Sequence, residues 1–242
     1  QVTVNGETRV ARDLGSTGAI NFDNGSLSTG GLLVALDDLS GTGTISTNGL
    51  VSDVDLVFDS SHGLSQTLNL TGPGRDITVY LYVDGSNKMG AGYGGTGSMR
   101  ISEGYVMHSN DGFIGYLPGS NGTVIVDGAA SSWVPGSLYV GYHGDGTLEI
   151  TNGGSVSNRY GCIGTLSGSS GAVTVSGAGS TWGDHGYRLT VGFRGAGSLH
   201  IDDGALVSVA GQMIIDQEYH GGSFVTMATG GMLALKGYAD SS

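Results

Sequence analysis

The sequence has few charged residues, 3 prolines and one cysteine. Charged residues make up 12 % of the 242 residues, about half the usual share. Cys162 stands alone, which excludes an internal disulfide. Every apolar run is far shorter than the roughly 18 residues of a membrane-spanning helix, so we expect no membrane insertion. The net charge of −12 disfavours nucleic acid and anionic membranes as partners.

Helix-forming segments are missing as well. The chain contains 48 Gly, and each Gly in a helix interior costs about 1 kcal/mol relative to Ala. Apolar residues alternate with polar ones in short runs, which is typical of strands and not of a disordered chain. The composition therefore predicts an all-β protein.

A short phrase, Gly followed by alternating apolar residues, recurs along almost the whole chain. Gly146–Ile150 and Gly171–Val175 are two clear copies. The phrase Gly stands at positions 18, 43, 97, 122, 146, 171, 197 and 222, so most intervals are 24 to 26 residues. One interval is long, and a degenerate copy at Gln66–Leu70 divides it. A period held this closely indicates a solenoid.

Equivalent positions of successive phrases are chemically alike, as stacked coils require. Two predicted columns are Met99, Val124, Leu148, Val173, Leu199 and Ile101, Val126, Ile150, Val175, Ile201. The distance from phrase Gly to turn Gly alternates, and Trp133 and Trp182 recur 49 residues apart. We predict a single-stranded parallel β-solenoid of about nine coils of ~25 residues, with two coil types alternating in a ~50-residue repeat.

The predicted domain organisation is one β-solenoid domain at 1–237 and a C-terminal tail at 238–242. Residues 92–237 hold the most regular repeats. Before them we expect first strands at Ala19–Asp23 and Thr44–Ser46 and a second strand at Val54–Phe58. Residues 72–90 break the rhythm and contain the apolar strand Ile77–Val83. They are interpreted as an inserted strand and loop that project from the stack, or as a coil of larger circumference.

The repeats resemble a known family. The matching segments are LYVGYHGDGTLEITNGGSVSN at 138–158 and DGFIGYLPGSNGTVIVDGAASSW at 111–133. They are similar to the glycine-rich repeats associated with bacterial autotransporters (type V secretion) and PEP-CTERM surface proteins. The resemblance implies a parallel β-solenoid on or outside a bacterial cell and carries no catalytic residues. The chain begins with Gln1 and not Met, which fits either a mature secreted chain after processing or a chain cut from a longer one. We expect a protein that is secreted, extracellular or on the bacterial cell surface.

The search for catalytic, cofactor-binding or metal-binding residues predicts none, and the chain is not expected to be an enzyme. The six histidines are scattered, and neither His143 with Asp145 nor His185 with Asp184 has a second His at ligand spacing. We interpret all six as solvated loop residues: His62, His108, His143, His185, His200 and His220. The adjacent pairs Asp37/Asp38 and Asp202/Asp203 should point to opposite faces of a strand. Five residues before turn glycines are expected to serve turns rather than binding: Asn24, Asn48, Asp127, Asn152 and Asp203. The Cys162 thiol is expected to point outward or lie in a tight turn.

Six aromatic residues leave two interpretations open: Tyr93, Tyr116, Tyr142, Phe193, Trp133 and Trp182. They cover coil corners and fill the core, or they form an exposed column that stacks sugars. The first functional hypothesis is a non-enzymatic extracellular structural protein. It would assemble head-to-tail through its solenoid ends into a filament, sheath or surface layer, with the 77–83 strand as a further pairing edge. The alternative is a cell-surface adhesin or a carbohydrate-binding passenger module. A polysaccharide-processing enzyme would need a carboxylate cluster that faces one groove.

Overall fold

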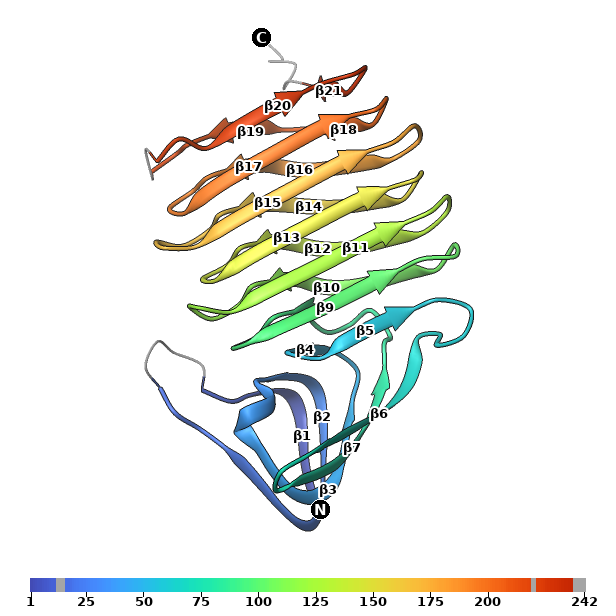
Figure 1. Ribbon diagram of the computed structural model, residues 1–242, viewed down its shortest axis with the longest axis vertical. Coiled ribbons are helices and arrows are strands. Elements are labelled where there is room, and N and C mark those ends of the chain that lie inside the picture. The colour runs from blue at the N-terminus through green and yellow to red at the C-terminus, as the bar shows by residue number, and fades with distance from the viewer. Residues whose placement is uncertain (12–15, 219–220, 237–242) are drawn as a thin grey trace.

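The computed structural model describes residues 1–11, 16–218 and 221–236, and only the backbone of residue 187. It is an all-β, parallel β-solenoid of about nine turns (Figure 1). The predicted fold class is confirmed. The predicted tail at 238–242 lies outside the described residues.

The described chain contains strands and one short 3-10 helix, η1, at Leu36–Asp38. The strands in the N-terminal part are β1 Val2–Arg9, β2 Ile20–Val34, β3 Leu39–Thr47, β4 Leu50–Ser52, β5 Asp55–Phe58, β6 Ser65–Gly72, β7 Arg75–Tyr82 and β8 Met89–Ala91. The strands of the regular coils are β9 Thr96–Ile101, β10 Val106–Ile114, β11 Asn121–Asp127, β12 Ser132–Val140, β13 Asp145–Thr151, β14 Ser155–Ile163, β15 Ser170–Ser176, β16 Thr181–Val191, β17 Ala196–Asp202, β18 Leu206–Val209, β19 Gln212–Ile215, β20 Phe224–Met227 and β21 Met232–Leu235.

These strands form a 14-stranded and a 7-stranded sheet that face each other across the core. Each regular coil gives one strand to each sheet, as β13 and β14 do. The 7-stranded sheet runs from β5 to β20, and Figure 1 shows its strands stacked in that order. Successive coils pair in parallel, which a solenoid requires.

The two predicted interior columns are confirmed residue by residue. Leu148 pairs with Val124 on one side and Val173 on the other, and Ile150 pairs with Val126 and Val175. All ten column residues are buried. The polar residue between them, Glu149, points away from the core and is half-buried. Period-two alternation therefore fixed both the strand and the face that it buries.

Glycine recurs because the coil corner has no room for a side chain. Gly141 has φ +71°, and a Cβ there would overlap the carbonyl oxygen of Ser170 in a neighbouring coil. A Cβ at the phrase glycine, Gly146, would overlap the backbone nitrogen of Gly141. The same backbone approaches recur at the corner glycines Gly92, Gly115 and Gly164, and at Gly192 the Cβ would meet the Ser223 side chain instead. Because the phrase glycine occupies the same corner in every coil, the number of residues between two phrases is the number of residues in one coil.

The two coil types differ inside the core. Trp133 and Trp182 alternate with Val156 in one interior column. Both indoles are buried, and both hydrogen-bond to the coil before them. Trp133 Nε1 donates to Ser109 Oγ (3.1 Å), and Trp182 Nε1 donates to Asn158 Oδ1 (2.6 Å). A large indole in one coil packs against a small valine in the next, so the core is filled by pairs of unlike coils. This pairing explains why the sequence repeats every ~50 residues.

The N-terminal part departs from three strand assignments made from the sequence. Gln66–Leu70 lies in β6, antiparallel to β7, and is not a rung of the solenoid. Val54–Phe58 is not a second strand, because Leu56 and Phe58 pair with Met99 and Ile101 in the phrase column. Thr44–Ser46 pairs with residues 26–28 in the 14-stranded sheet and does not stack on Ala19–Asp23. Alternation alone does not distinguish these cases, because hairpin strands and solenoid strands have the same period.

Residues 72–90 contain β7, which is the second strand of a β-hairpin with β6, and the start of β8. β7 pairs in parallel with β3 and antiparallel with β6, so both of its edges are already hydrogen-bonded. The hairpin lies beside the N-terminal strands, at the narrow end of the molecule in Figure 1. Its free edge is therefore that of β6 and not that of the 77–83 strand.

Candidate functional site

The C-terminal end of the solenoid is unfinished within the described residues. β20 is the last strand of the 7-stranded sheet, and β21 is the last strand on the path of the 14-stranded sheet. No described strand pairs with their outer edges. We call β19, β20 and β21 the open end; it lies at the top of Figure 1.

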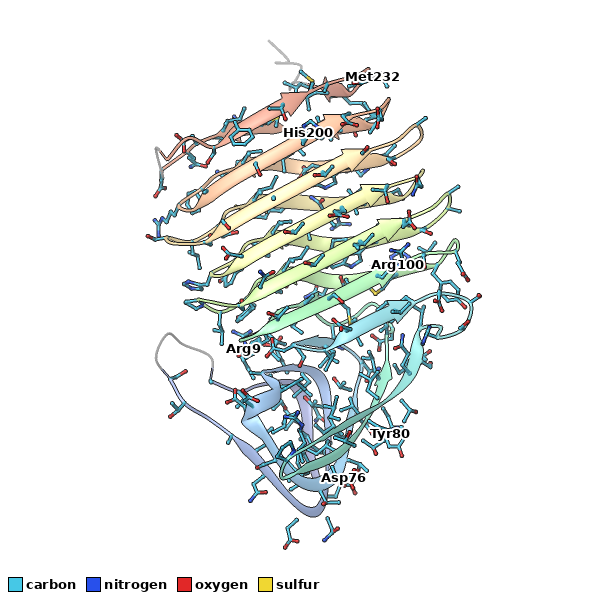
Figure 2. All side chains as sticks on the ribbon, in the orientation of Figure 1. Arg9, Asp76, Tyr80, Arg100, His200 and Met232 are labelled. Carbon is cyan, nitrogen blue, oxygen red and sulfur yellow. The ribbon has the colours of Figure 1, made fainter. Side chains whose placement is uncertain are left out.

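Side chains of the interior columns are exposed at the open end. Ile215, Met227 and Leu235 are 47 %, 57 % and 57 % exposed. The residues paired with them one coil earlier are 0 % exposed: Val191, Ile201 and Val209. Two further apolar side chains at this end, Phe224 and Met232, are also exposed; Figure 2 labels Met232 at the top of the stack. Within residues 221–236 and the coil before them, the interior columns are therefore left partly uncovered at this end.

The backbone of the open end also has unused hydrogen-bonding capacity. Ala228 N–H donates to Ile201 O (3.0 Å), and Lys236 N–H donates to Val209 O (2.9 Å). Amide directions alternate along a strand, so the N–H groups of Met227 and Leu235 point to the outer edge. The strands carry no charged residue, proline or bulge that would discourage further pairing. The uncharged runs FVTM and MLAL were the sequence signal for this end.

The N-terminal end has features that oppose pairing with another chain, and the open end lacks them. The edge strand β1 has a register shift between Val4 and Glu7 and carries Glu7 and Arg9. Glu7 binds Arg9, and it also binds Lys88 Nζ at 2.7 Å. β5 is the edge strand of the 7-stranded sheet at this end. Gln66 Nε2 donates a hydrogen bond to the Val57 carbonyl (2.8 Å), so this outward-facing acceptor of β5 is already occupied. Bulges and charges on edge strands oppose pairing with another chain.

The six aromatic residues do not form one exposed column. Trp133 and Trp182 fill the core, as one of the two interpretations predicts. Tyr93, Tyr116 and Tyr142 do stack in a column outside the solenoid, with ring centroids 5.1 and 5.2 Å apart. Their faces are therefore occupied by one another, and mainly ring edges remain for a ligand.

A second ladder fits against this exterior column. Phe113 and Tyr139 stack at 5.0 Å, and both meet Tyr142 edge to face. The N-terminal strand covers the lower part: Tyr93 Oη donates to Val10 O (2.6 Å), and the Arg9 guanidinium lies 5.5 Å from the Tyr116 ring. Phe193 lies apart from these rings and contacts the Arg194 guanidinium. The exterior aromatics thus fasten the N-terminal strand to the coils.

Three of the described histidines lie in strands and not in loops as predicted: His108 in β10, His185 in β16 and His200 in β17. His108 and His185 line one hollow of about 330 Å³. His62 contacts Asp59 (2.7 Å), and His200 contacts Asp202 (3.0 Å) and Thr226. Partial burial lowers the pKa of His143. Within residues 1–11, 16–218 and 221–236, no group of three or more His, Cys, Asp or Glu could hold a metal. His220 lies outside the described residues.

Asp184 and His185 are consecutive residues of β16, and their side chains lie on opposite faces of the sheet. His185 is exposed, whereas Asp184 is buried and accepts hydrogen bonds from Asn158 Nδ2 (2.9 Å) and the Gly186 amide (3.2 Å). Burial raises the pKa of Asp184 to about 6, although these hydrogen bonds oppose the shift. Asn158 also accepts from Trp182, so the three side chains form one buried network. We assign this network to core packing.

Other carboxylates serve turns and loops. Asp53 accepts the amides of Tyr93 (2.7 Å) and Gly94 (3.0 Å), and Asp127 accepts from Thr151 and Asn152. Asn152 and Asp203 have positive φ, as expected for turns. Asn24 also has positive φ but lies inside β2, where the register with β3 shifts, and not in the predicted turn. Asp37 and Asp38 lie in η1 and not on a strand. Burial, and then repulsion from Asp37 and Asp53, raises the pKa of Asp38.

Cys162 points outward, as predicted, but it is buried beneath the exterior residues. It occupies the same outward column as Tyr139, with which it pairs. Burial raises the pKa of the Cys162 thiol, and contacts with Thr165, Tyr160 and Arg188 oppose the shift only in part. Such a thiol is a poor nucleophile.

Comparison with protein-family models finds no match, and neither characterised proteins nor solved structures match the chain. The resemblance to glycine-rich surface repeats therefore stays a prediction. In the described residues, no helix has the length and apolar character needed to cross a membrane.

Proposed function

We propose that this chain is a non-enzymatic structural β-solenoid that acts outside the cell and assembles with a second copy through its open end. The observation that carries the proposal is the exposure of the interior columns at β19, β20 and β21. Three columns that are fully buried one coil earlier are about half exposed there. Covering them would also pair the free edges of β20 and β21.

The strength of this association can be estimated from the side chains at the open end. Six residues belong to the interior columns or pack beside them: Met213, Ile215, Val225, Met227, Leu233 and Leu235. Ile215, Met227 and Leu235 are about half exposed, and the other three are already partly buried. Finishing their burial in both copies gains roughly 6–10 kcal/mol, at about 1 kcal/mol for each half-exposed side chain and less for each of the others. Association itself costs about 4–15 kcal/mol. Because the two terms are comparable, we expect a dimer that dissociates on dilution.

Two-fold symmetry suits the open end. Rotation of a second copy about an axis perpendicular to the stack brings the last strands together in antiparallel orientation, which edge strands can accept. Such an interface is isologous and closed, so it yields a dimer and no larger species.

Head-to-tail assembly into a filament is a second candidate. An apolar hollow of about 380 Å³ lies between β1 and β2 and includes Val2, Val4 and Phe22 in its lining. This hollow would receive the open end of another copy. The charges and the register shift of β1 make this arrangement less favourable than pairing of two open ends.

Two sets of observations support a structural role without catalysis. The hydrogen bonds of Asp53 and Asp127 hold loops and turns, and Asp184 lies inside the core. An extracellular location is supported by the acidic, cysteine-poor composition and by the family resemblance.

Sedimentation equilibrium across a concentration series tests the proposal. The wild-type chain should move from 24.4 kDa toward twice that mass as its concentration rises. The variant Met227→Asp/Leu235→Asp should stay at 24.4 kDa, because an unpaired carboxylate buried at the interface costs several kcal/mol. Both side chains are more than half exposed in the single copy, so the variant should keep its fold.

The matched control is Val106→Asp, which places the same charge at an exposed apolar position on β10, away from the open end. It should associate as the wild type does. A wild-type chain that is monomeric throughout, or a double variant that still dimerises, overturns the proposal. Mass that grows without limit overturns the closed dimer in favour of the filament.

A further inference from the structure

The outer face of the β6–β7 hairpin exposes two aromatic rings side by side. Along β7, Ile77, Val79 and Leu81 are buried, whereas Tyr80 and Tyr82 are 49 % and 58 % exposed. The two tyrosines are two residues apart on one strand, so their attachment points lie about 7 Å apart on the same face. Figure 2 labels Tyr80 on the outer side of this hairpin. Because residues 77–83 are mostly apolar, the sequence alone does not indicate that Tyr80 and Tyr82 lie on an exposed face.

The faces of both rings remain available. Tyr80 lies opposite Ser46 on β3 and Thr67 on β6, and Tyr82 lies opposite Ser65. These neighbours are too short to cover an aromatic ring. In the described part of the chain, the ring-to-ring contacts belong to the exterior column and involve neither tyrosine. The hairpin rings therefore differ from Tyr93, Tyr116 and Tyr142, whose faces stack on one another.

A polar, uncharged hollow adjoins the rings. It has a volume of about 330 Å³, and its lining includes Ser46, Asn48, Ser65, Gln66 and Thr67 beside the two tyrosines. Asn48 Nδ2 already donates to Asp84 (2.8 Å), and Gln66 Nε2 donates to Val57 O and Gly63 O. Both amides are thereby held in place, and their oxygens are left as acceptors. Although the chain has a net charge of −12, no charged residue lines this hollow.

We infer that the Tyr80–Tyr82 face binds a neutral polysaccharide that runs along β7. The apolar C–H face of a sugar packs on an aromatic ring, while its hydroxyls bond to neighbouring hydroxyls and amides. An apolar protein surface would leave those polar groups unpaired, which is costly. A charged glycan would find no opposite charge in the lining. An elongated chain of uncharged sugars can both stack on the two rings and hydrogen-bond to the polar side chains of the hollow.

Pull-down with insoluble cellulose and chitin, followed by calorimetry with cellohexaose and chitohexaose, tests the inference. At least one of these neutral glycans should bind the wild-type chain. Tyr80→Ala/Tyr82→Ala should weaken that binding by at least about tenfold, and Tyr80→Phe/Tyr82→Phe should largely retain it, because the phenyl face remains. Thr67→Arg keeps both tyrosines but places a bulky, charged side chain opposite Tyr80, so it should also weaken glycan binding.

Two controls separate this surface from the rest of the molecule. Phe224→Ala removes an exposed ring at the open end and should leave glycan binding unchanged. Thermal unfolding of each variant should match the wild type, because the altered side chains are exposed; if the alanine variant fails to fold, Thr67→Arg carries the test. No binding to any of the four neutral glycans, binding of anionic alginate alone, or equal binding by the wild-type and alanine chains would overturn the inference.

Discussion

Replacing Gly141 by Ala tests the corner packing that sets one coil on the next, and Gly119 supplies a matched comparison. Both glycines have positive φ, +71° and +80°. Alanine at either position costs about 1–2 kcal/mol for the left-handed backbone alone. A Cβ at Gly119 meets no atom within 4 Å, whereas a Cβ at Gly141 overlaps the Ser170 carbonyl.

The overlap adds a second term at Gly141. The Ser170 carbonyl belongs to β15, which is paired with β13 along its length, so it cannot move without disturbing that ladder. Overpacking of this kind costs about 1–3 kcal/mol. We therefore expect Gly141→Ala to lose about 2–5 kcal/mol of unfolding free energy, and Gly119→Ala about 1–2 kcal/mol.

Urea unfolding followed by the fluorescence of the two buried tryptophans measures both losses. For a chain of this length, the loss in Gly141→Ala corresponds to a fall in Tm of about 4–20 °C. Equal losses in the two variants would refute the reasoning, because they would show that only backbone strain matters. A Gly141→Ala chain as stable as the wild type would refute it as well.

Two further predictions concern buried titratable groups. The pKa of Asp184 is raised from 3.8 to about 6, so its contribution to stability is fully present below pH 3.8 and is lost as the pH rises through 6. Urea unfolding of wild type and Asp184→Asn should therefore show the variant gaining about 1–3 kcal/mol relative to wild type between pH 4 and pH 8, and a difference that is independent of pH would contradict the assignment. The Cys162 thiol should react with a thiol reagent at pH 8 at least about 100-fold more slowly in the native chain than in urea, and rapid native labelling would show that the thiol is accessible.

The regular coils were predictable because one pattern specifies several features at once. The alternation around Leu148 and Ile150 identifies a strand and its buried face, and the 24–26-residue spacing identifies which strands are neighbours. The alternation of Trp133 and Trp182 with smaller residues likewise follows from the doubled repeat. Each of these features depends on contacts between equivalent positions of successive coils, and such contacts leave a periodic trace in the sequence.

The N-terminal part was less predictable because its contacts are not between equivalent positions. Gln66–Leu70 has the alternation of a rung, but the turn after Gly72 folds it antiparallel to β7. For Tyr93, Tyr116 and Tyr142 the sequence left two interpretations open, cover of coil corners or an exposed column. Their stacking and their cover by the N-terminal strand depend on how distant segments meet. The two exposed tyrosines of β7 were hidden for a simpler reason: Tyr counts as apolar in a pattern, whichever face it occupies.

Hydrogen exchange at β20 and β21, measured by mass spectrometry at low and high protein concentration, tests the central claim most directly. If a second copy covers the open end, the amides of Met227 and Leu235 should exchange more slowly as concentration rises, while the exchange of β6 stays constant. Exchange at β20 and β21 that is fast at every concentration, or protection that develops at the N-terminal strands as well, would contradict assembly through paired open ends.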